Sequence, residues 1–302
     1  MKLGIRLFQL IIAVSALTFF NSCGDDEPGT MTVDPPRAIF ESSVATDNSG
    51  TVTFTNFSVG ADSYVWDFGD GSGSSTEENP SYTYSESGKY TVTLTVTNAG
   101  GTDDSESEVS VAFNIIAAGD MSDEATWTFK QVWDDPDNGV DHAFADGTFL
   151  WDNSESTLYS QSYLWQEVAV EAGKTYRFSA DIAASAGTNG IWFELYFGNA
   201  DPANEGDYNS NGLRLYVSSF DDPVSGCAND PFSGDFVSVA QGCMPNAEET
   251  KILAADGTFT LTAEELTENG TIYLVFKSGS WDSADNYKDG IALDNVAIVE
   301  VL

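Results

Sequence analysis

The chain has 302 residues, which is enough for two ordinary domains with their own hydrophobic cores. Its 48 Asp and Glu residues far outnumber its 11 Lys and Arg residues, and the formal net charge is −37 at pH 7. So strong a negative field repels nucleic acids and anionic lipid surfaces, whereas neutral and cationic partners stay open. Most of these acidic residues are expected simply to keep an exported protein soluble.

Residues 1–22 are predicted to be a processing segment that is removed from the mature protein. Lys2 and Arg6 make a basic start, and the apolar run that ends at Phe20 is too short for a comfortable membrane span. The motif FNSC, which ends at Cys23, resembles a bacterial lipobox. This resemblance implies cleavage before Cys23 and a diacylglycerol on its sulfur, and two or three acyl chains would hold the protein firmly on a membrane. The alternative is an ordinary secretory signal with an incidental cysteine.

Residues 23–36 are predicted to be an acidic linker. Proline and glycine punctuate this stretch, which is typical of an extended tether. Its first part, GDDEPG, resembles the export signal of Bacteroidetes surface lipoproteins. That resemblance implies a lipid-anchored protein on the outer face of the outer membrane.

Residues 37–112 are predicted to form a small all-β sandwich. Short alternating runs such as TVTFTNFS and YTVTLTVTN are separated by the turn signals GDGSGSS, ESGK and NAGG. The motif WDFGDG, followed by NP, YTY and GKY, closely resembles a polycystic-kidney-disease (PKD) domain. The resemblance implies an Ig-like spacer module without catalytic residues. We expect Trp66 to anchor its core, and Asp67 and Asp70 to bond the backbone of their own turn rather than a cation.

Residues 113–302 are predicted to form a second all-β domain, a jelly roll or β-sandwich. Its strand-like runs are WQEVAV, TYRFSADIAA, GIWFELYFG, GLRLYVSSF, GTFTLTA, GTIYLVFKSG and GIALDNVAIVEV. The segments FNIIAAGDMSDEATWTF, QEVAVEAGKTYRFSADIAA and DGIALDNVAIVEV resemble family 4-like carbohydrate-binding modules. The resemblance implies a glycan-binding groove on one sheet, together with a structural calcium in many members.

The calcium that this resemblance implies lies where the first and last strands meet. That position carries over to Asp120 and Asp294. This sequence has Ser122 where the family often has a carboxylate, so Asp123 or Asp141 would have to substitute. The alternative is that these residues are capped turns and solvated acids.

Four predicted strands carry aromatic residues beside charged or amide groups on the face opposite their apolar face. Such a face suits a sugar, whose C–H face packs on an aromatic ring while its hydroxyls bond polar groups. The alternative is that the aromatic residues form cross-strand pairs or lie beneath a loop. The predicted ligand-binding residues are Trp192, Glu194, Tyr196, Arg214, Tyr216, Trp165 and Lys277, with Trp151 and Trp281 at loop or strand-end positions suited to a groove rim.

Cys227 and Cys243 are the two cysteines that follow Cys23. In an exported chain such a pair predicts a disulfide, and its loop of roughly 16 residues contributes about 3 kcal/mol in a loop-entropy model. The loop is long enough to overhang a groove on the neighbouring sheet.

Enzymatic activity is not expected. The only histidine, His142, lies in an acidic stretch without a nucleophile motif. A glycosidase needs only two carboxylates, yet no strand carries a clustered set.

The expected function is capture of a polysaccharide by a non-catalytic lipoprotein of a polysaccharide-utilisation system. The ligand is expected to be a neutral glucan, first of all a laminarin-like β-1,3-glucan, although Arg214 and Lys277 keep anionic glycans open. The expected partners are an outer-membrane glycan transporter and surface glycoside hydrolases, with no nucleic acid and no catalytic cofactor. The alternatives are a surface adhesin that binds protein and a divergent glycoside hydrolase.

Overall fold

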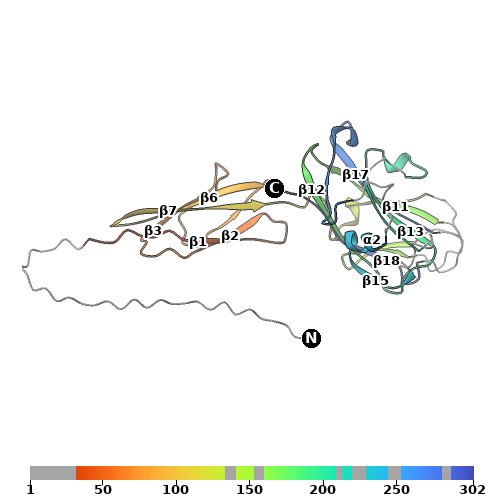
Figure 1. Ribbon diagram of the computed structural model, residues 1–302, viewed down its shortest axis with the longest axis horizontal. Helices are drawn as coiled ribbons and strands as arrows, with labels where there is room; N and C mark the ends of the chain where they lie inside the picture. Colours follow the sequence, from red (N-terminus) through yellow and green to blue (C-terminus); the bar gives the residue numbers. More distant parts are fainter. Residues whose placement is uncertain are drawn as a thin grey trace, which may run out of the picture.

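The structure is a computed structural model, which describes residues 32–132, 141–152, 160–208, 213–219, 229–243, 253–280 and 287–302. The predictions for Cys23, Cys227 and Trp281 lie outside these residues, as do those for the side chains of Arg214 and Cys243. Two β-sandwich domains follow one another along the chain (Figure 1). Within the described ranges, no helix has the length and apolar character needed to span a bilayer.

The first domain is a sandwich of two antiparallel sheets. One sheet has the order β1-β2-β5 and the other the order β4-β3-β6-β7. The strands are β1 (Phe40–Val44), β2 (Thr51–Asn56), β3 (Ser63–Asp67), β4 (Ser74–Ser75), β5 (Ser81–Thr83), β6 (Gly88–Asn98) and β7 (Gly101–Val111). Alternating residues of both sheets, among them Val92, Leu94 and Val96 of β6, fill the space between them.

The PKD-like motif has the structural role that the sequence predicts. Trp66 is fully buried between the sheets, and its indole N–H donates to the carbonyl oxygen of Glu77 at 2.9 Å. Asp67 accepts a hydrogen bond from the backbone N–H of Gly69, and Asp70 accepts from two N–H groups of its own turn. The expectations for Trp66, Asp67 and Asp70 are therefore confirmed.

The second domain is a larger sandwich of two sheets. One sheet has the order β15-β12-β18-β10-β9, with β16 also paired to β12, and the other has the order β14-β13-β17-β11-β8. The strands of the first are β9 (Asp141–Ala145), β10 (Thr148–Asp152), β12 (Thr175–Ala184), β15 (Phe232–Asp235), β16 (Thr258–Thr260) and β18 (Ile291–Glu300). Those of the second are β8 (Thr128–Gln131), β11 (Ser160–Ala169), β13 (Ile191–Gly198), β14 (Leu213–Ser218) and β17 (Thr271–Ser280).

Short helices close the second sandwich. The α-helix α2 (Phe236–Cys243) puts Phe236, Val237 and Ala240 into the core. In the described part of the chain, three single turns of 3-10 helix lie in connections, namely η1 (Glu124–Thr126), η2 (Pro202–Asn204) and η4 (Ala263–Glu265). The predicted fold class, an Ig-like sandwich followed by a jelly-roll sandwich, is confirmed.

One buried polar residue explains part of the motif that resembles carbohydrate-binding modules. Gln166 of β11 lies on the core side, where its amide oxygen accepts from Ala117 N–H at 2.8 Å. Its amide nitrogen donates at 3.0 Å to the carbonyl oxygens of Ala117 and Thr126. Gln166 thereby fixes the segment that leads into the domain, which is a structural role.

Candidate functional site

Of the predicted ligand-binding residues that the structure describes, all but Trp151 lie on the outer face of the five-stranded sheet, which we call the aromatic face. Strand alternation directs Ile191, Phe193, Leu195 and Phe197 of β13 into the core, so Trp192, Glu194 and Tyr196 point the other way. The aromatic face is defined by Trp192, Glu194 and Tyr196 of β13, Tyr216 and Ser218 of β14, Lys277 and Gly279 of β17, and Gln161, Tyr163 and Trp165 of β11.

Strand register brings these residues together in rows across the sheet. β14 and β17 flank β13 on its two sides. Glu194 lies opposite Tyr216 on one side and opposite Lys277 on the other. Lys277 in turn lies opposite Tyr163 of β11. The sequence left open whether the GLRLY strand lies beside the GIWFELYFG strand, and the structure pairs the two.

Trp192 forms a flat platform at one end of the aromatic face. It lies opposite Gly279, and a Cβ atom added at Gly279 would come within 2.7 Å of its Nε1 and closer still to Cε2 and Cζ2. The indole therefore lies directly over the Gly279 backbone, which only a residue without a side chain permits. Trp192 stays partly exposed, as does Tyr216 one row away.

A buried ion network occupies the middle of the aromatic face. The Lys277 ammonium lies 3.1 Å from Glu194 Oε2 and 2.7 Å from Asp207 Oδ1. The side chains of Lys277 and Glu194 are only 6% and 9% exposed. Tyr196 donates its hydroxyl to Glu194 Oε2 at 2.7 Å. Lys277 and Glu194 therefore satisfy each other in a desolvated site, as buried charges must.

The connection after β13 covers the other end of the face. Tyr208 is fully buried, and its ring packs edge-on against Tyr196 and Tyr163. Its backbone N–H donates to the Tyr163 hydroxyl at 2.8 Å. Lys130 of β8 donates to three carbonyl oxygens of the same connection, at 2.8 to 3.2 Å. Burial raises the pKa of Tyr163 to about 12, so this hydroxyl stays protonated at neutral pH.

These contacts divide the predicted ligand-binding residues into two groups. Tyr196 and Trp165 lie in a small apolar cluster beneath the connection, at 1% and 8% exposure. Tyr196 and Trp165 therefore match the alternative in which the aromatic residues lie beneath a loop. Trp192 and Tyr216 are the predicted aromatic residues of the face that keep access to solvent.

The position expected for Trp151 is wrong. It lies in the interior of β10, fully buried, and faces the core rather than a groove rim. Its ring packs edge-on against Phe149 and Phe193, and its N–H donates to Ser162 Oγ at 3.2 Å. The alternation of Phe149 and Trp151 in TFLWD carries this signal, since both then share the core side of one strand.

Four residues of the aromatic face were not among the predicted ligand-binding residues, namely Gly279, Ser218, Gln161 and Tyr163. Nor were three residues that contribute to the ion network or to the covering connection, namely Asp207, Tyr208 and Lys130. Tyr163 had a usable signal, because it precedes Trp165 by two residues on the same strand. Asp207 and Tyr208 come from an irregular connection, and no periodicity marks their positions.

The acidic residues predicted to bind calcium lie on different elements. Among the residues that the structure describes, no group of three or more His, Cys, Asp or Glu could hold a metal ion. Asp120 bonds Ser122, and Asp294 bonds the N–H of Asn295. Asp141 is the first residue of β9 and lies opposite Asp152 of β10. Calcium also takes backbone and amide oxygens, so calcium binding here stays a prediction.

Asp294 lies opposite a second carboxylate, which disfavours its ionised form. It pairs across the strands with Asp181, and the Asn295 amide donates to both carboxylates. Burial, followed by repulsion from Asp181 and Asp120, raises the pKa of Asp294 above its ordinary value.

His142 lies at an exposed position of β9. Its ring stacks on Phe129 with the centroids 3.7 Å apart, and desolvation of the ring lowers its pKa.

Comparison with known proteins identifies the first domain. Residues 33–113 match the family model described as "PKD domain". The PKD1 domain of the Vibrio cholerae metalloprotease PrtV is 40% identical over 25% of this chain and 95% of its own length, with a TM-score of 0.23. This segment of the chain therefore belongs to the PKD domain family.

Solved structures of carbohydrate-binding modules resemble the chain as well. A structure described in a study of "carbohydrate-binding modules from the beta-sandwich super family" is 17% identical, covering 88% of this chain and 98% of its own, with a TM-score of 0.37. A structure titled "CBM4 structure and function" is 13% identical, covering 62% of this chain and 99% of its own, with a TM-score of 0.33. No curated protein matches the chain.

Proposed function

We propose that the protein is a non-catalytic, surface-exposed lipoprotein that captures a polysaccharide with the aromatic face of its second domain. A lipid on Cys23 anchors it to the outer membrane, and the PKD domain holds the second domain away from the membrane. Its partners are an outer-membrane glycan transporter and surface glycoside hydrolases of a polysaccharide-utilisation system.

The observation that carries the proposal is the Trp192 platform. The indole lies over the Gly279 backbone and is partly exposed, and the axial C–H groups of a sugar pack well on an aromatic face. Tyr216, which is also partly exposed, lies one row away on the neighbouring strand, and a tyrosine hydroxyl can bond sugar hydroxyls as donor or acceptor.

The charges of the face favour a neutral glycan. Lys277, which by itself would attract an anion, is already bonded to Glu194 and Asp207 and is almost completely buried. The triad carries one positive and two negative charges, so it repels sulfate and uronate groups. We therefore propose a neutral β-glucan as the ligand, with laminarin-like β-1,3-glucan as the first candidate.

The same network argues for binding rather than catalysis. A retaining or inverting glycosidase needs two carboxylates that flank the scissile bond. Glu194 instead holds Lys277 and accepts from Tyr196, and its side chain is 9% exposed. Its role is structural support of the face.

Affinity electrophoresis tests the proposal. The chain from Gly24 onward is run through native gels that contain laminarin, other neutral β-glucans or sulfated polysaccharides. Retardation in a neutral glucan gel, with none in the sulfated gels, is expected. Retardation in none of the gels would overturn glycan binding and favour the adhesin, and release of short products from a retained glucan would favour the hydrolase.

A further inference from the structure

The junction between the two domains has no free linker residue. Phe113 belongs to the PKD domain, where its ring packs against the core and covers Gly50. Its backbone N–H donates to Ser87 Oγ at 3.0 Å. Ile116 is buried in the core of the second domain, and Ile115 packs against that core and donates its N–H to Ile298 of β18. The chain passes from one core to the other within two residues.

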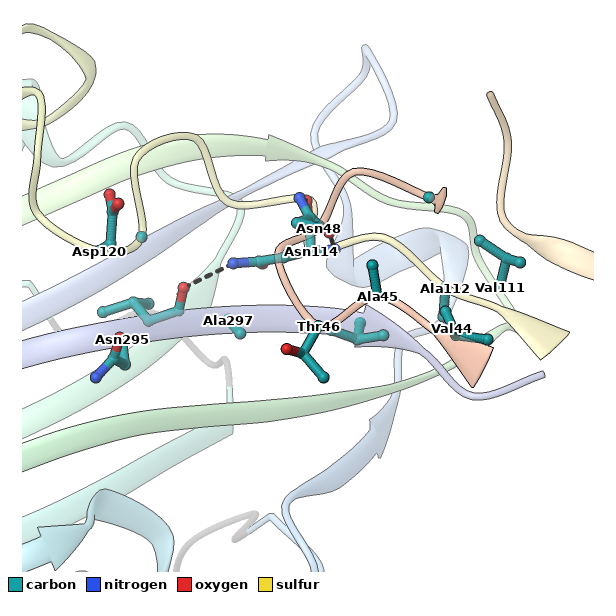
Figure 2. Close-up of a pocket in the computed structure, with 14 residues that line it drawn as sticks. Val44, Ala45, Thr46, Asn48, Val111, Ala112, Asn114, Asp120, Asn295 and Ala297 are labelled. Atoms are coloured by element: carbon teal, nitrogen blue, oxygen red, sulfur yellow. Dashed lines mark hydrogen bonds between the residues drawn. The ribbon is translucent and has the colours of Figure 1, made fainter. Parts of the chain in front are cut away.

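Asn114, between Phe113 and Ile115, is tied to the second domain by its side chain. Its amide oxygen accepts from the N–H groups of Ile116 and Ile298, both at 3.0 Å. Its amide nitrogen donates to the carbonyl oxygen of Val296 at 3.0 Å, the bond drawn in Figure 2. All three bonds lie across the start of the domain and strand β18, so they fix the direction in which the chain leaves the PKD domain.

The backbone of Asn114 is tied to the first domain by Asn48. The Asn48 side chain accepts from Asn114 N–H at 2.6 Å and donates to Asn114 O at 3.2 Å. Asn48 lies in the β1–β2 turn with a φ of 60°, a left-handed conformation that asparagine tolerates better than most residues. Figure 2 shows Asn48 and Asn114 side by side, between the β1–β2 turn and strand β18.

The interface continues around this pair as a cleft that both domains line. Its volume is about 360 Å³, and Val44, Ala45 and Thr46 of the PKD domain face Asp120 and Ala297 of the second domain across it. The Asn48–Asn114 pair joins the two domains beside this cleft, so a rotation of one domain against the other has to strain its hydrogen bonds.

We propose that the PKD domain and the second domain move as one rigid body, clasped by the Asn48–Asn114 pair. The surface of the PKD domain that carries Asn48 is thus an interaction surface whose partner is the second domain of the same chain. The side chain of Asn114 makes three hydrogen bonds to the second domain, and its backbone makes two to Asn48 of the PKD domain. A change in the backbone torsions of Asn114 would therefore break at least one of these hydrogen bonds.

The clasp gives the PKD domain a defined length as a spacer. The chain enters it beside the β6–β7 turn, where the Asn98 amide donates to Asp34 O at 2.9 Å. It leaves at the other end of β7, whose 11 residues span about 34 Å. If the joint is rigid, the PKD domain holds the aromatic face at a fixed distance and orientation from the point where the chain enters it. A flexible joint would fix neither the distance nor the orientation.

Residual dipolar couplings of backbone N–H groups test the proposal on the chain from Gly24 onward, which retains every described residue. One alignment tensor is expected to fit the couplings of β6 and β7 together with those of β11, β13 and β17. Asn48→Gly removes the clasping amide and tolerates the positive φ, so the fold of each domain is kept. In this variant each domain is expected to need its own tensor, with a smaller alignment magnitude for one of them.

Asn204→Ala is the matched control. Its amide donates to Asp201 at 2.9 Å within the η2 turn, far from the joint in sequence, and a single tensor is expected to survive. A wild-type chain that already needs two tensors would overturn the rigid joint. An Asn48→Gly chain that keeps one unchanged tensor would overturn the role of the clasp. Glycan retardation of Asn48→Gly is expected to equal that of the wild type, because the joint and the aromatic face share no residue.

Discussion

Replacing Lys277 by methionine tests whether the aromatic face is held together by its buried ion network. The substitution keeps the apolar length of the side chain and removes the ammonium that lies 3.1 Å from Glu194 and 2.7 Å from Asp207. Glu194 then loses the Lys277 ammonium from its buried site, although the Tyr196 hydroxyl still bonds it. Removing one partner of a buried pair costs about 3–5 kcal/mol.

The contributions of the two carboxylates differ. Asp207 is 58% exposed, so its bond to Lys277 resembles a surface pair and contributes about 1 kcal/mol or less. The cost of Lys277→Met therefore arises mainly from Glu194, and we expect the free energy of unfolding to fall by about 3 kcal/mol. The double variant Glu194→Gln/Lys277→Met carries no buried charge at this position and is expected to regain at least half of that loss.

Urea unfolding followed by tryptophan fluorescence measures these differences. Six of the seven tryptophans lie after residue 113, so the signal reports mainly on the second domain. Arg177→Met is the control, because its pair with Asp256 is 3.9 Å long and more than half exposed on both sides. It should change stability by less than about 0.5 kcal/mol. A double variant as unstable as Lys277→Met would refute the reasoning, since the loss would then come from packing and not from an unpaired charge.

Three further predictions concern single residues. Gly279→Ala should reduce glycan affinity by roughly tenfold or more, because the new methyl displaces the Trp192 ring, whereas Gly206→Ala, which meets nothing within 4 Å, should leave retardation unchanged. Gln166→Leu should lower the free energy of unfolding by about 2–3 kcal/mol, since backbone groups of the entering segment lose their partners, and urea unfolding checks this. Asp294→Asn should raise the melting temperature at pH 7. The folded state raises the pKa of Asp294, so its ionisation disfavours folding above that pKa, and the gain should vanish below about pH 3.8, where the carboxyl is protonated in both states. A gain from Asp294→Asn that persists at pH 3 would contradict this cause.

Alternation predicted the faces of the second domain well, because the two faces of a strand are fixed by backbone geometry alone. Trp192, Glu194 and Tyr196 do share one face, and the residues between them do fill the core. Alternation did not establish that the GLRLY strand is the neighbour of this strand, because an apolar face sets the register of a pair but does not choose the partner.

What alternation could not predict is whether the outer face meets water. The connection that carries Asp207 and Tyr208 folds back over the sheet, and it buries Tyr196 although that residue points away from the main core. This docking depends on long-range contacts, such as Lys130 with the carbonyl oxygens of η2. No local pattern in the chain encodes contacts of that kind, so the candidate site is smaller than the sequence suggested.

The contact between the two domains could not be predicted from local sequence either. Asn48 and Asn114 are ordinary polar residues in sequence, and nothing local marks either as an interdomain contact. Their pairing appears only when the β1–β2 turn and strand β18 are placed in space.

The most direct test of the central claim is affinity electrophoresis of the wild type and of Trp192→Ala in laminarin gels. Truncating an aromatic anchor of a binding site costs about 2 kcal/mol, which corresponds to a loss of affinity of roughly 30-fold. The account predicts that the wild type is retarded, and that Trp192→Ala, with unchanged melting temperature, runs as in a gel without glucan. Equal retardation of the two proteins would show that the glycan binds elsewhere and would contradict the assignment of the aromatic face.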